Sequence, residues 1–259
     1  MADTQDIPSI TIGQDMQALS KKQEQAYDHP GHFWEFVFNQ KLASFHWEIA
    51  EILLEGHTNP TGECNPALVL APRDHAKSTC GEAFILWKIG HNPLELVQIV
   101  SSVQPLAKQR LRKVASCIKE NEKYRSLFGN LFPDDSEYTW STEAIEVIRD
   151  RSQAWETGQA ERDPTCVALG ITTSVEGGRS TLQVFDDIVS VENSQSELTR
   201  DSVRTKFWMS FDPMLLPNGQ QILFGTRYHY ADFYSELIPL FDTEKLYTAL
   251  YPDSPEQDE

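Results

Sequence analysis

One segment of the chain has the residue types and spacing of a phosphate-binding loop. An apolar run, residues 67–71, is followed by a turn that begins at Pro72 and then by Lys77, Ser78 and Thr79, which open a predicted helix. In such a strand-loop-helix arrangement the loop N–H groups and the helix N-terminus face an anion. The lysine adds a positive charge and the hydroxyl holds Mg²⁺. The segment is therefore a candidate for binding a phosphate group with its metal ion.

The two glycines of the usual pattern, G-x-x-x-x-G-K-[ST], are missing from this segment. Ala71 and Ala76 stand in their places. We expect Ala76 to adopt an ordinary helical φ, which alanine does without strain. Taken alone, the segment is better explained as a plain connection between a strand and a helix. Whether it is a phosphate-binding loop depends on motifs elsewhere in the chain.

A pair of carboxylates supplies the second half of the same chemistry. Asp186 and Asp187 follow the apolar run 181–185. At an ATP site the first carboxylate of such a pair orients the Mg²⁺ shell, and the second polarises the attacking water. The alternative is a polar strand end without a catalytic role.

Two further segments are candidates for the same site. Thr226 comes just after the apolar run 220–224. Polar groups at the carboxyl end of a strand are where open α/β sheets bind ligands. Phe45 and His46 lie just upstream of the first predicted strand, where a nucleotide base could pack against them. The alternative for this pair is a core helix with a partly exposed histidine.

Strands and helices alternate along the chain, which predicts a mostly parallel, doubly wound α/β sheet flanked by helices. The predicted strands are residues 67–71, 94–102, 144–148, 165–170, 181–185, 220–224 and 246–250. The predicted helices are residues 14–27, two within 33–54, 80–90, 105–121, 203–211 and 231–240. Lys77, Asp186 and Thr226 then all fall at carboxyl ends of strands. Together these signals indicate a P-loop NTPase.

The formal net charge of −17 over 259 residues argues against a freestanding, non-specific DNA-binding domain, which is normally basic. One segment is nevertheless basic, and we expect phosphate-backbone contact there; the alternative is an ordinary solvated helix face. Its cations are Lys108, Arg110, Arg112, Lys113, Lys119, Lys123 and Arg125.

No apolar run approaches the roughly 18–20 residues of a membrane span. The acidic, polar N-terminus is not that of a signal peptide. The four cysteines, at positions 64, 80, 117 and 166, are widely spaced and are expected to be free thiols.

The order and spacing of the motifs resemble the ATPase domain of the large terminase subunit, the motor of DNA packaging in tailed bacteriophages. The resemblance covers about residues 33–241. It is carried by Ala71-Pro72-Arg73, Ala76-Lys77-Ser78-Thr79, Asp186-Asp187-Ile188-Val189, Glu192-Asn193, Gly225-Thr226-Arg227-Tyr228-His229 and Asp232, together with Phe45-His46-Trp47-Glu48-Ile49-Ala50 and the Ser101-Ser102 segment that ends at Ala107.

The resemblance implies a P-loop NTPase of the additional-strand, RecA/helicase-like type that binds ATP and Mg²⁺. The nucleotide would contact the loop and first helical turn, namely Pro72, Arg73, Asp74, His75, Ala76, Lys77, Ser78 and Thr79, as well as Phe45, His46 and Thr226. Ser78 and Asp186 would hold the metal. Arg73 resembles the family's phosphate-sensing arginine, and Asp187 occupies the position where many relatives carry a catalytic Glu, with Glu192 as the alternative base.

Arg179, in a Gly-rich connector, is our candidate for an arginine finger donated to a neighbouring subunit, with Arg162 as second choice. The resemblance further implies double-stranded DNA inside an oligomeric ring, a portal protein and a small terminase subunit as partners. The chain would be a monomer in isolation and would act in the host cell cytoplasm, away from any membrane.

The expected organisation is a polar N-terminal arm (1–30), partly disordered, a motor domain (31–251) and an acidic tail or truncated linker (252–259). No carboxylate cluster remains for a nuclease, so no nuclease activity is expected. The alternative functions are a helicase-like, nucleic-acid-dependent ATPase and a degenerate P-loop scaffold that binds partners without hydrolysing ATP.

Overall fold

The sheet of the protein has six strands in the order β1-β6-β5-β2-β4-β3. They are β1 (Ala67–Leu70), β2 (Val97–Ser101), β3 (Ala144–Ile145), β4 (Cys166–Gly170), β5 (Ser180–Asp186) and β6 (Leu215–Gly225). The structure is a computed structural model that describes residues 12–58, 66–149, 163–173 and 178–240. Within this part of the chain, β3 alone runs antiparallel to its neighbour, and the other five strands are mutually parallel.

The strand order identifies the type of fold. β1, which leads into the Lys77 loop, does not pair with β5, which ends in the carboxylates. Instead, β6 is inserted between them, in register with β1 from Ala67 opposite Ile222 to Leu70 opposite Gly225. One strand added between the phosphate-loop strand and the carboxylate strand is the arrangement of the additional-strand, RecA/helicase-like P-loop NTPases. The predicted fold class is therefore confirmed.

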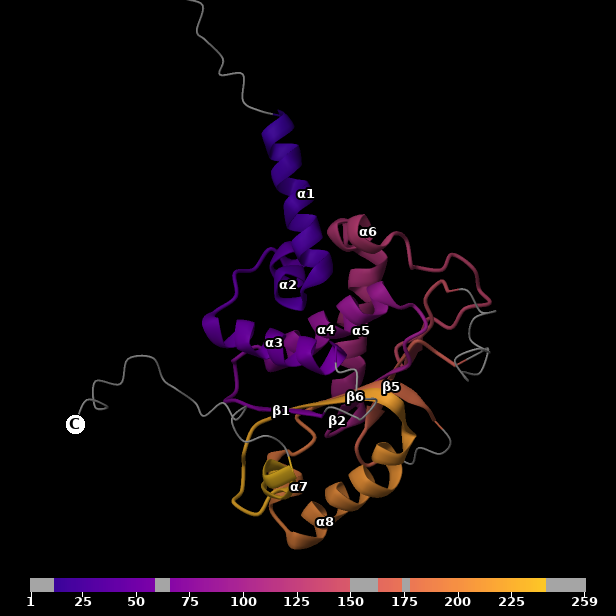
Figure 1. Ribbon diagram of the computed structural model, residues 1–259. Coiled ribbons are helices and arrows are strands. Elements are labelled where there is room, and N and C mark those ends of the chain that lie inside the picture. Colours follow the sequence, from indigo (N-terminus) through magenta and orange to yellow (C-terminus); the bar gives the residue numbers. More distant parts are fainter. Residues whose placement is uncertain (1–11, 59–65, 150–162, 174–177, 241–259) are drawn as a thin grey trace, which may run out of the picture.

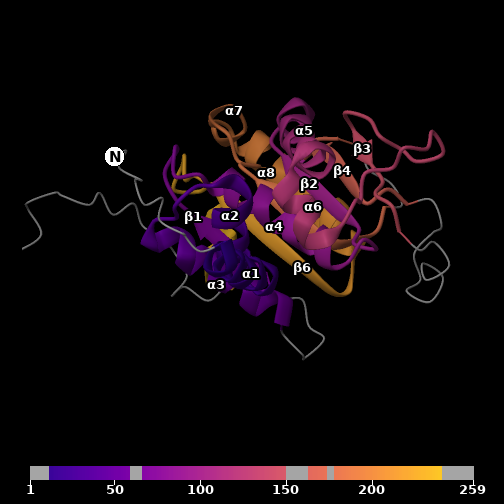
Figure 2. The ribbon, with the colours of Figure 1, turned by 90° about the horizontal axis from the view of Figure 1, so that it is seen from above.

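Helices cover both faces of the sheet (Figure 1). One face carries α1 (Ile12–Asp28), α2 (Pro30–Phe38), α3 (Ser44–Thr58), α4 (Lys77–His91), α5 (Gln104–Glu120) and α6 (Glu122–Phe128). The other face carries α7 (Val191–Ser194), α8 (Glu197–Lys206) and α9 (Phe233–Leu237). Seen from above, the strands lie beneath α4 and α5, and β3 lies at the edge farthest from β1 (Figure 2).

Two hydrophobic cores result, because successive side chains of a strand point to opposite faces of the sheet. Val69 and Val184 belong to the larger core beneath α2–α6, which contains the fully buried Phe84. Their neighbours Leu68 and Phe185 belong to the smaller core, which α8 and α9 cover. The near-continuous apolar runs of the central strands follow from this burial on both faces.

Several predicted boundaries differ from the structure. The strand predicted at 220–224 is longer in the structure, because β6 begins at Leu215 and includes Asn218, which has a φ of 66° where the pairing with β5 shifts register. The helix predicted at 203–211 is the end of α8 followed by a π-helical turn, Phe207–Phe211. The helix predicted at 231–240 is reduced to α9 and a 3₁₀ turn.

Local capping explains two short helices that periodicity did not predict. Asn121 ends α5 and its side chain caps α6, accepting from the Tyr124 N–H. Ser190 and Asn193 form a reciprocal capping box for α7. The strand predicted at 246–250 lies outside the described residues, and the strand predicted at 144–148 is limited to the two residues of β3.

Among the described helices, none combines the length and apolar character needed to cross a membrane. Cys80, Cys117 and Cys166 are buried free thiols, as predicted, and Cys64 lies outside the described residues. Burial raises the pKa of the Cys117 thiol to about 12.

Candidate functional site

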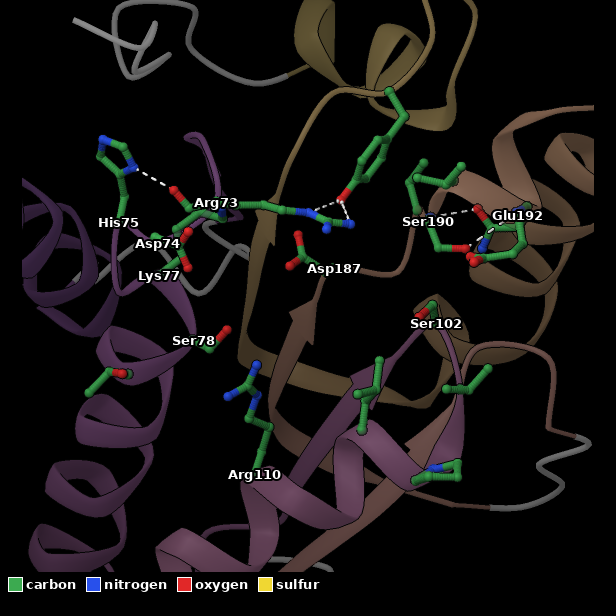
Figure 3. A pocket seen from close by; sticks show the side chains of 18 of the residues that line it. Arg73, Asp74, His75, Lys77, Ser78, Ser102, Arg110, Asp187, Ser190 and Glu192 are labelled. Carbon is green, nitrogen blue, oxygen red and sulfur yellow. Dashed lines mark hydrogen bonds between the residues drawn. The ribbon is translucent and has the colours of Figure 1, made fainter. Parts of the chain in front are cut away.

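A cavity of about 840 Å³ opens at the edge of the sheet where β1, β5 and β6 end (Figure 3). The loop after β1 forms one wall, and the start of α5 and the segment after β5 form the opposite wall. Its lining includes the sequence-predicted residues Arg73, Asp74, His75, Ala76, Lys77, Ser78, Thr79, Asp187 and Glu192. Chain segments more than 100 residues apart thus meet at the carboxyl edge of one sheet, as parallel strands require.

The Lys77 ammonium group is buried and hydrogen-bonded by the loop itself. It donates to the carbonyl oxygens of Ala71 at 2.6 Å and Pro72 at 2.7 Å, and to the Thr226 hydroxyl at 3.0 Å. Burial lowers the pKa of Lys77, while the nearby carboxylates of Asp187 and Asp186 act in the opposite direction. Lys77 and Thr226, which are 149 residues apart, therefore form one polar unit at the ends of β1 and β6.

The loop backbone contradicts our expectation for Ala76. Ala76 has a φ of 51° and Asp74 a φ of 66°, so both lie in the left-handed region. The reason is geometric: the chain must reverse between β1 and α4 within a few residues, and Ala76 is the residue that caps α4. Left-handed residues in such a loop can turn neighbouring backbone N–H groups toward one side, as in concave anion-binding loops. The glycine in the usual pattern is thus replaced at a position that does favour glycine.

Ser78 and Asp186 join the two halves of the site. The Ser78 hydroxyl donates to Asp186 Oδ1 at 2.7 Å, and Asp186 is 4% exposed at the end of β5. A hydroxyl and a carboxylate are hard oxygen donors that suit Mg²⁺, which retains waters and phosphate oxygens as its other ligands. The residues therefore fit the metal ion that the fold implies. Within the described ranges there is no cluster of three or more His, Cys, Asp or Glu side chains that would form a separate metal site.

Asp187 is the most unusual residue of the cavity. It has a φ of 48°, and its N–H donates to the Phe224 carbonyl of β6. Its Oδ1 atom is buried and has no hydrogen-bond partner among the described residues. Burial and the neighbouring Asp186 raise the pKa of Asp187, and Lys77, Arg110 and Arg73 partly offset this effect. A strained backbone and an unpaired buried carboxylate oxygen are typical of functional positions.

Arg73 projects across the cavity mouth toward the end of β6 (Figure 3). Its Nε and Nη2 atoms donate to the Tyr228 hydroxyl at 2.9 and 2.8 Å, and the guanidinium carbon lies 5.4 Å from the centre of the Tyr228 ring. Arg73 is thus tethered by a neutral partner.

Glu192 lies on the far wall at the start of α7, where its own backbone N–H and Ser190 lower its pKa.

The residues after Thr226 form a compact hydrogen-bonded turn. Arg227 forms an ion pair with the buried Asp232 at 3.0 Å and donates to the Ser235 hydroxyl at 2.8 Å. Asp232 also accepts from the N–H of Tyr228. Gly225 allows this turn to pack closely, because a Cβ atom at this position would lie 2.3 Å from Tyr234. The turn connects the cavity to α9.

Six of the predicted residues that the structure describes do not line the cavity. Pro72, Asp186 and Thr226 are hydrogen-bonded to the lining residues Lys77 and Ser78. The other three are Phe45, His46 and Arg179. Phe45 and His46 lie beside the loop, with His46 Nε2 3.3 Å from the His75 carbonyl oxygen and the Phe45 ring 5.7 Å from the His75 ring. Arg179 precedes β5, so it lies at the opposite edge of the sheet, about 20 Å from the carboxylates at 3.3 Å per residue. It cannot reach the cavity of its own chain. Arg162 lies outside the described residues.

Arg110 and Tyr228 also line the cavity, although the sequence did not predict a role for either of them at this site. Arg110 donates through Nε to Asp186 Oδ2 at 2.8 Å. It was counted only as part of the basic segment. The helical spacing of Ala107, Leu111 and Val114, the buried stripe of α5, places Arg110 next to that stripe. This pattern could have indicated that the Arg110 side chain faces the protein rather than the solvent.

Several cations of the basic segment bind the chain's own acidic groups. Lys108 pairs with Glu143 at 2.6 Å, and Lys113 pairs with Glu82 at 3.1 Å. Lys119 lies over the Phe132 ring at 4.9 Å from its centre. The positive charge of this helix is therefore partly neutralised within the protein.

No protein-family model matches the chain, and no curated protein matches it. Among solved structures, the large terminase of bacteriophage HK97 is similar, with a TM-score of 0.53 and 12% identity over 85% of this chain. The chain spans 41% of the length of that terminase. A weaker similarity, with a TM-score of 0.47 and 12% identity, is to S. cerevisiae dbp5 in a structure with gle1 and ip6; it covers 88% of this chain and 49% of that one. The strand order and the similarity to the terminase together give the chain a P-loop ATPase fold.

Proposed function

We propose that the chain is a Mg²⁺-dependent ATP hydrolase, acting as the motor domain of a phage large terminase that moves double-stranded DNA into a procapsid. The observation that carries the proposal is the 2.7 Å hydrogen bond between Ser78 and Asp186, with the unpaired carboxylate oxygen of Asp187 beside it. These groups hold a metal and act on a water in phosphoryl transfer.

The charged and polar residues described above have the following roles in this chemistry. The N–H groups of the loop and Lys77 bind the β- and γ-phosphates, and Ser78 and Asp186 hold Mg²⁺, which neutralises charge on the phosphates when bound. Asp187 orients the attacking water and accepts its proton. Its raised pKa supports this role, since a base is most effective when its pKa lies near the working pH. Glu192, at the other wall, is the alternative base.

Two arginines complete the proposed site. Arg73 contacts the γ-phosphate in its own chain, and its neutral partner Tyr228 leaves its positive charge available for that purpose. Arg179 serves a neighbouring subunit in the ring, a role compatible with its distance from its own cavity. Thr226 links the phosphate-bound Lys77 to the turn after β6 and thereby couples hydrolysis to movement.

The DNA-packaging part of the proposal rests on the motif resemblance and on the fold similarity to the HK97 terminase. This part of the proposal also includes a portal protein and a small terminase subunit as partners, a ring formed by copies of the chain, and action in the host cytoplasm. A separate candidate is a P-loop scaffold that does not hydrolyse ATP. The left-handed φ at Ala76, a position suited to glycine, favours this second candidate.

Steady-state ATPase activity decides between the two. Wild type, Lys77→Ala and Asp187→Asn are compared over a range of protein concentrations, with Lys41→Ala and Asp134→Asn as controls at exposed positions outside the cavity. We expect each cavity variant to lose about 100-fold or more of kcat, and each control to keep it. No activity in wild type at high concentration, or activity unaffected by Lys77→Ala, would overturn the hydrolase proposal.

A mixing experiment tests the role of Arg179. If the arginine acts in trans, specific activity rises with protein concentration. A mixture of Lys77→Ala and Arg179→Ala chains then recovers turnover that neither has alone. A mixture no more active than its parts would remove Arg179 from the site.

A further inference from the structure

Arg110 occupies the carboxylate that the metal ion requires. The Arg110 Nε atom donates to Asp186 Oδ2 at 2.8 Å, while Asp186 Oδ1 accepts from the Ser78 hydroxyl. Both oxygens of Asp186 are thus bound by donors from this chain. The side chain of Arg110 is 25% exposed and that of Asp186 is 5% exposed, so the ion pair is largely shielded from water.

A guanidinium group bound to Asp186 opposes the binding of magnesium at the same carboxylate. Mg²⁺ demands near-octahedral oxygen coordination at about 2.0–2.1 Å, and a guanidinium group has no lone pair to offer as a ligand. Two positive charges beside one shielded carboxylate also repel each other. The Ser78 hydroxyl, in contrast, can rotate and present its oxygen to the metal.

A second carboxylate is placed to retain Arg110 when it leaves Asp186. Glu82, on α4, lies 3.3 Å from Arg110 Nη1 and 3.1 Å from the Lys113 ammonium nitrogen. The side chain of Glu82 is 7% exposed, and burial raises its pKa despite the two cations. Arg110 therefore bridges the metal carboxylate of β5 and a buried carboxylate of the phosphate-loop helix.

We propose that Arg110 competes with Mg²⁺ for Asp186. Arg110 holds the carboxylate until the metal arrives with the nucleotide, and is then displaced toward Glu82 and the cavity. Metal binding thereby changes the ion pairs of α5, the most basic of the helices that the structure describes. The inference rests on the proposed function, because it presumes that Ser78 and Asp186 hold the metal.

The test measures metal dependence with ADP as the probe, so no turnover is involved. The dissociation constant of ADP is measured by calorimetry over a series of Mg²⁺ concentrations for wild type, Arg110→Ala, Arg110→Gln and Arg112→Gln. We expect the Mg²⁺ concentration for half-maximal ADP affinity to fall about tenfold in both Arg110 variants. Arg112→Gln, on an exposed position of the same helix outside the cavity, should behave like wild type.

Thermal unfolding supplies an independent readout. Without metal, the Arg110 variants lose the ion pair between Arg110 and Asp186, so their Tm should lie below that of wild type. Saturating Mg²⁺ and ADP should then raise Tm more in these variants than in wild type. Arg110→Gln keeps most of the side-chain volume, which separates loss of charge from loss of packing.

Three results would overturn the inference. The half-maximal Mg²⁺ concentration could be the same in wild type and both Arg110 variants. Folded Arg110 variants could fail to bind ADP even at saturating Mg²⁺, which would make Arg110 a nucleotide ligand rather than a competitor. Wild type itself could fail to bind ADP with Mg²⁺; this last result alone would also remove the proposed function.

Discussion

The two arginines that line the cavity are held in opposite ways. Arg73, in the phosphate loop, is exposed and bound by the neutral hydroxyl of Tyr228. Arg110, on the opposite wall, is partly buried and bound by the carboxylates of Asp186 and Glu82. Figure 3 shows the two guanidinium groups on opposite sides of Asp187.

The difference lies in how much positive charge each arginine offers to a ligand. A phenol hydroxyl orients a guanidinium group without cancelling its charge, whereas a carboxylate largely cancels it. In the proposed site, Arg73 can contact a phosphate directly. In the proposed exchange, Arg110 becomes available only after Mg²⁺ replaces it on Asp186. Residues of the same type in one cavity thus present different amounts of charge, because their partners differ in charge.

The strongest test of this comparison is Arg73→Ala. Because the hydrogen-bond partner of Arg73 is neutral and leaves its charge available to a phosphate, we expect kcat for ATP hydrolysis to fall about a thousandfold. The Mg²⁺ concentration for half-maximal ADP affinity should stay unchanged, in contrast to the Arg110 variants. Equal effects of Arg73→Ala and Arg110→Ala on both quantities would erase the distinction between the two arginines.

Tyr228→Phe sharpens the comparison by removing the tether and keeping the ring. Arg73 loses its hydrogen bonds to the hydroxyl but retains a ring beneath its guanidinium group. We expect kcat to fall about fivefold, as for the loss of one ordinary hydrogen bond. Steady-state kinetics measures the effect, with Tyr230→Phe, at an exposed tyrosine two residues further along, as the control. A loss as large as that of Arg73→Ala would give Tyr228 a direct role instead.

Ala76→Gly tests the backbone of the Arg73 wall. At a φ of 51° glycine carries no steric cost, so the folded chain should gain about 1 kcal/mol in the free energy of unfolding. Urea unfolding measures the change. Ala115→Gly, within α5, is the matched control and should lose about 1 kcal/mol. Destabilisation by both substitutions would contradict the left-handed conformation of Ala76.

Glu82→Gln tests the Arg110 wall through pH. Burial holds the pKa of Glu82 above its ordinary value of 4.5, so the folded chain retains this proton to higher pH than the unfolded chain. The free energy of unfolding of wild type should therefore fall, relative to Glu82→Gln, as pH rises from about 4.5 through the raised pKa. Outside that window the difference should be constant. At pH 7 the free energies of unfolding of wild type and Glu82→Gln should differ by less than about 1 kcal/mol. Arg110 and Lys113 are partly exposed, so water can solvate them when their carboxylate partner is removed.

Paired urea unfolding curves between pH 4 and 7 measure this dependence. Glu143→Gln, at the exposed partner of Lys108, is the control for loss of one carboxylate from an ion pair with α5. The opposite result would be a free energy of unfolding of wild type that rises with pH relative to that of Glu82→Gln. It would show that the ion pairs of Glu82 outweigh the cost of burying its charge.

The sequence alone was sufficient for the fold class and for the phosphate-loop wall. Apolar runs of strand length, separated by helical segments, predict a parallel sheet, and the strand ends then bring Lys77, Asp186 and Thr226 to one edge. These inferences succeeded because they depend on local patterns and on the short, regular connections of α/β units. The predicted start of the strand at 220–224 was wrong for the converse reason, because pairing with β5 extends β6 back to Leu215 through residues that locally favour a turn.

The remaining features depend on contacts between residues far apart in the chain. Arg73 meets Tyr228 across 155 residues, and Arg110 meets Asp186 across 76. Helical periodicity places Arg110 beside the buried face of α5, but it does not say which carboxylate lies opposite.

The sequence on its own determined the order in which the main strands and helices follow one another along the chain, and the residue types at the strand ends. The tertiary structure alone decided the left-handed φ of Ala76 and the partners of Arg73 and Arg110. Loop geometry follows from how α4 is seated on the sheet, and the charge left on each arginine follows from the distance and burial of its partner. Neither quantity is encoded in residue spacing, because both arise only when the separate elements pack together.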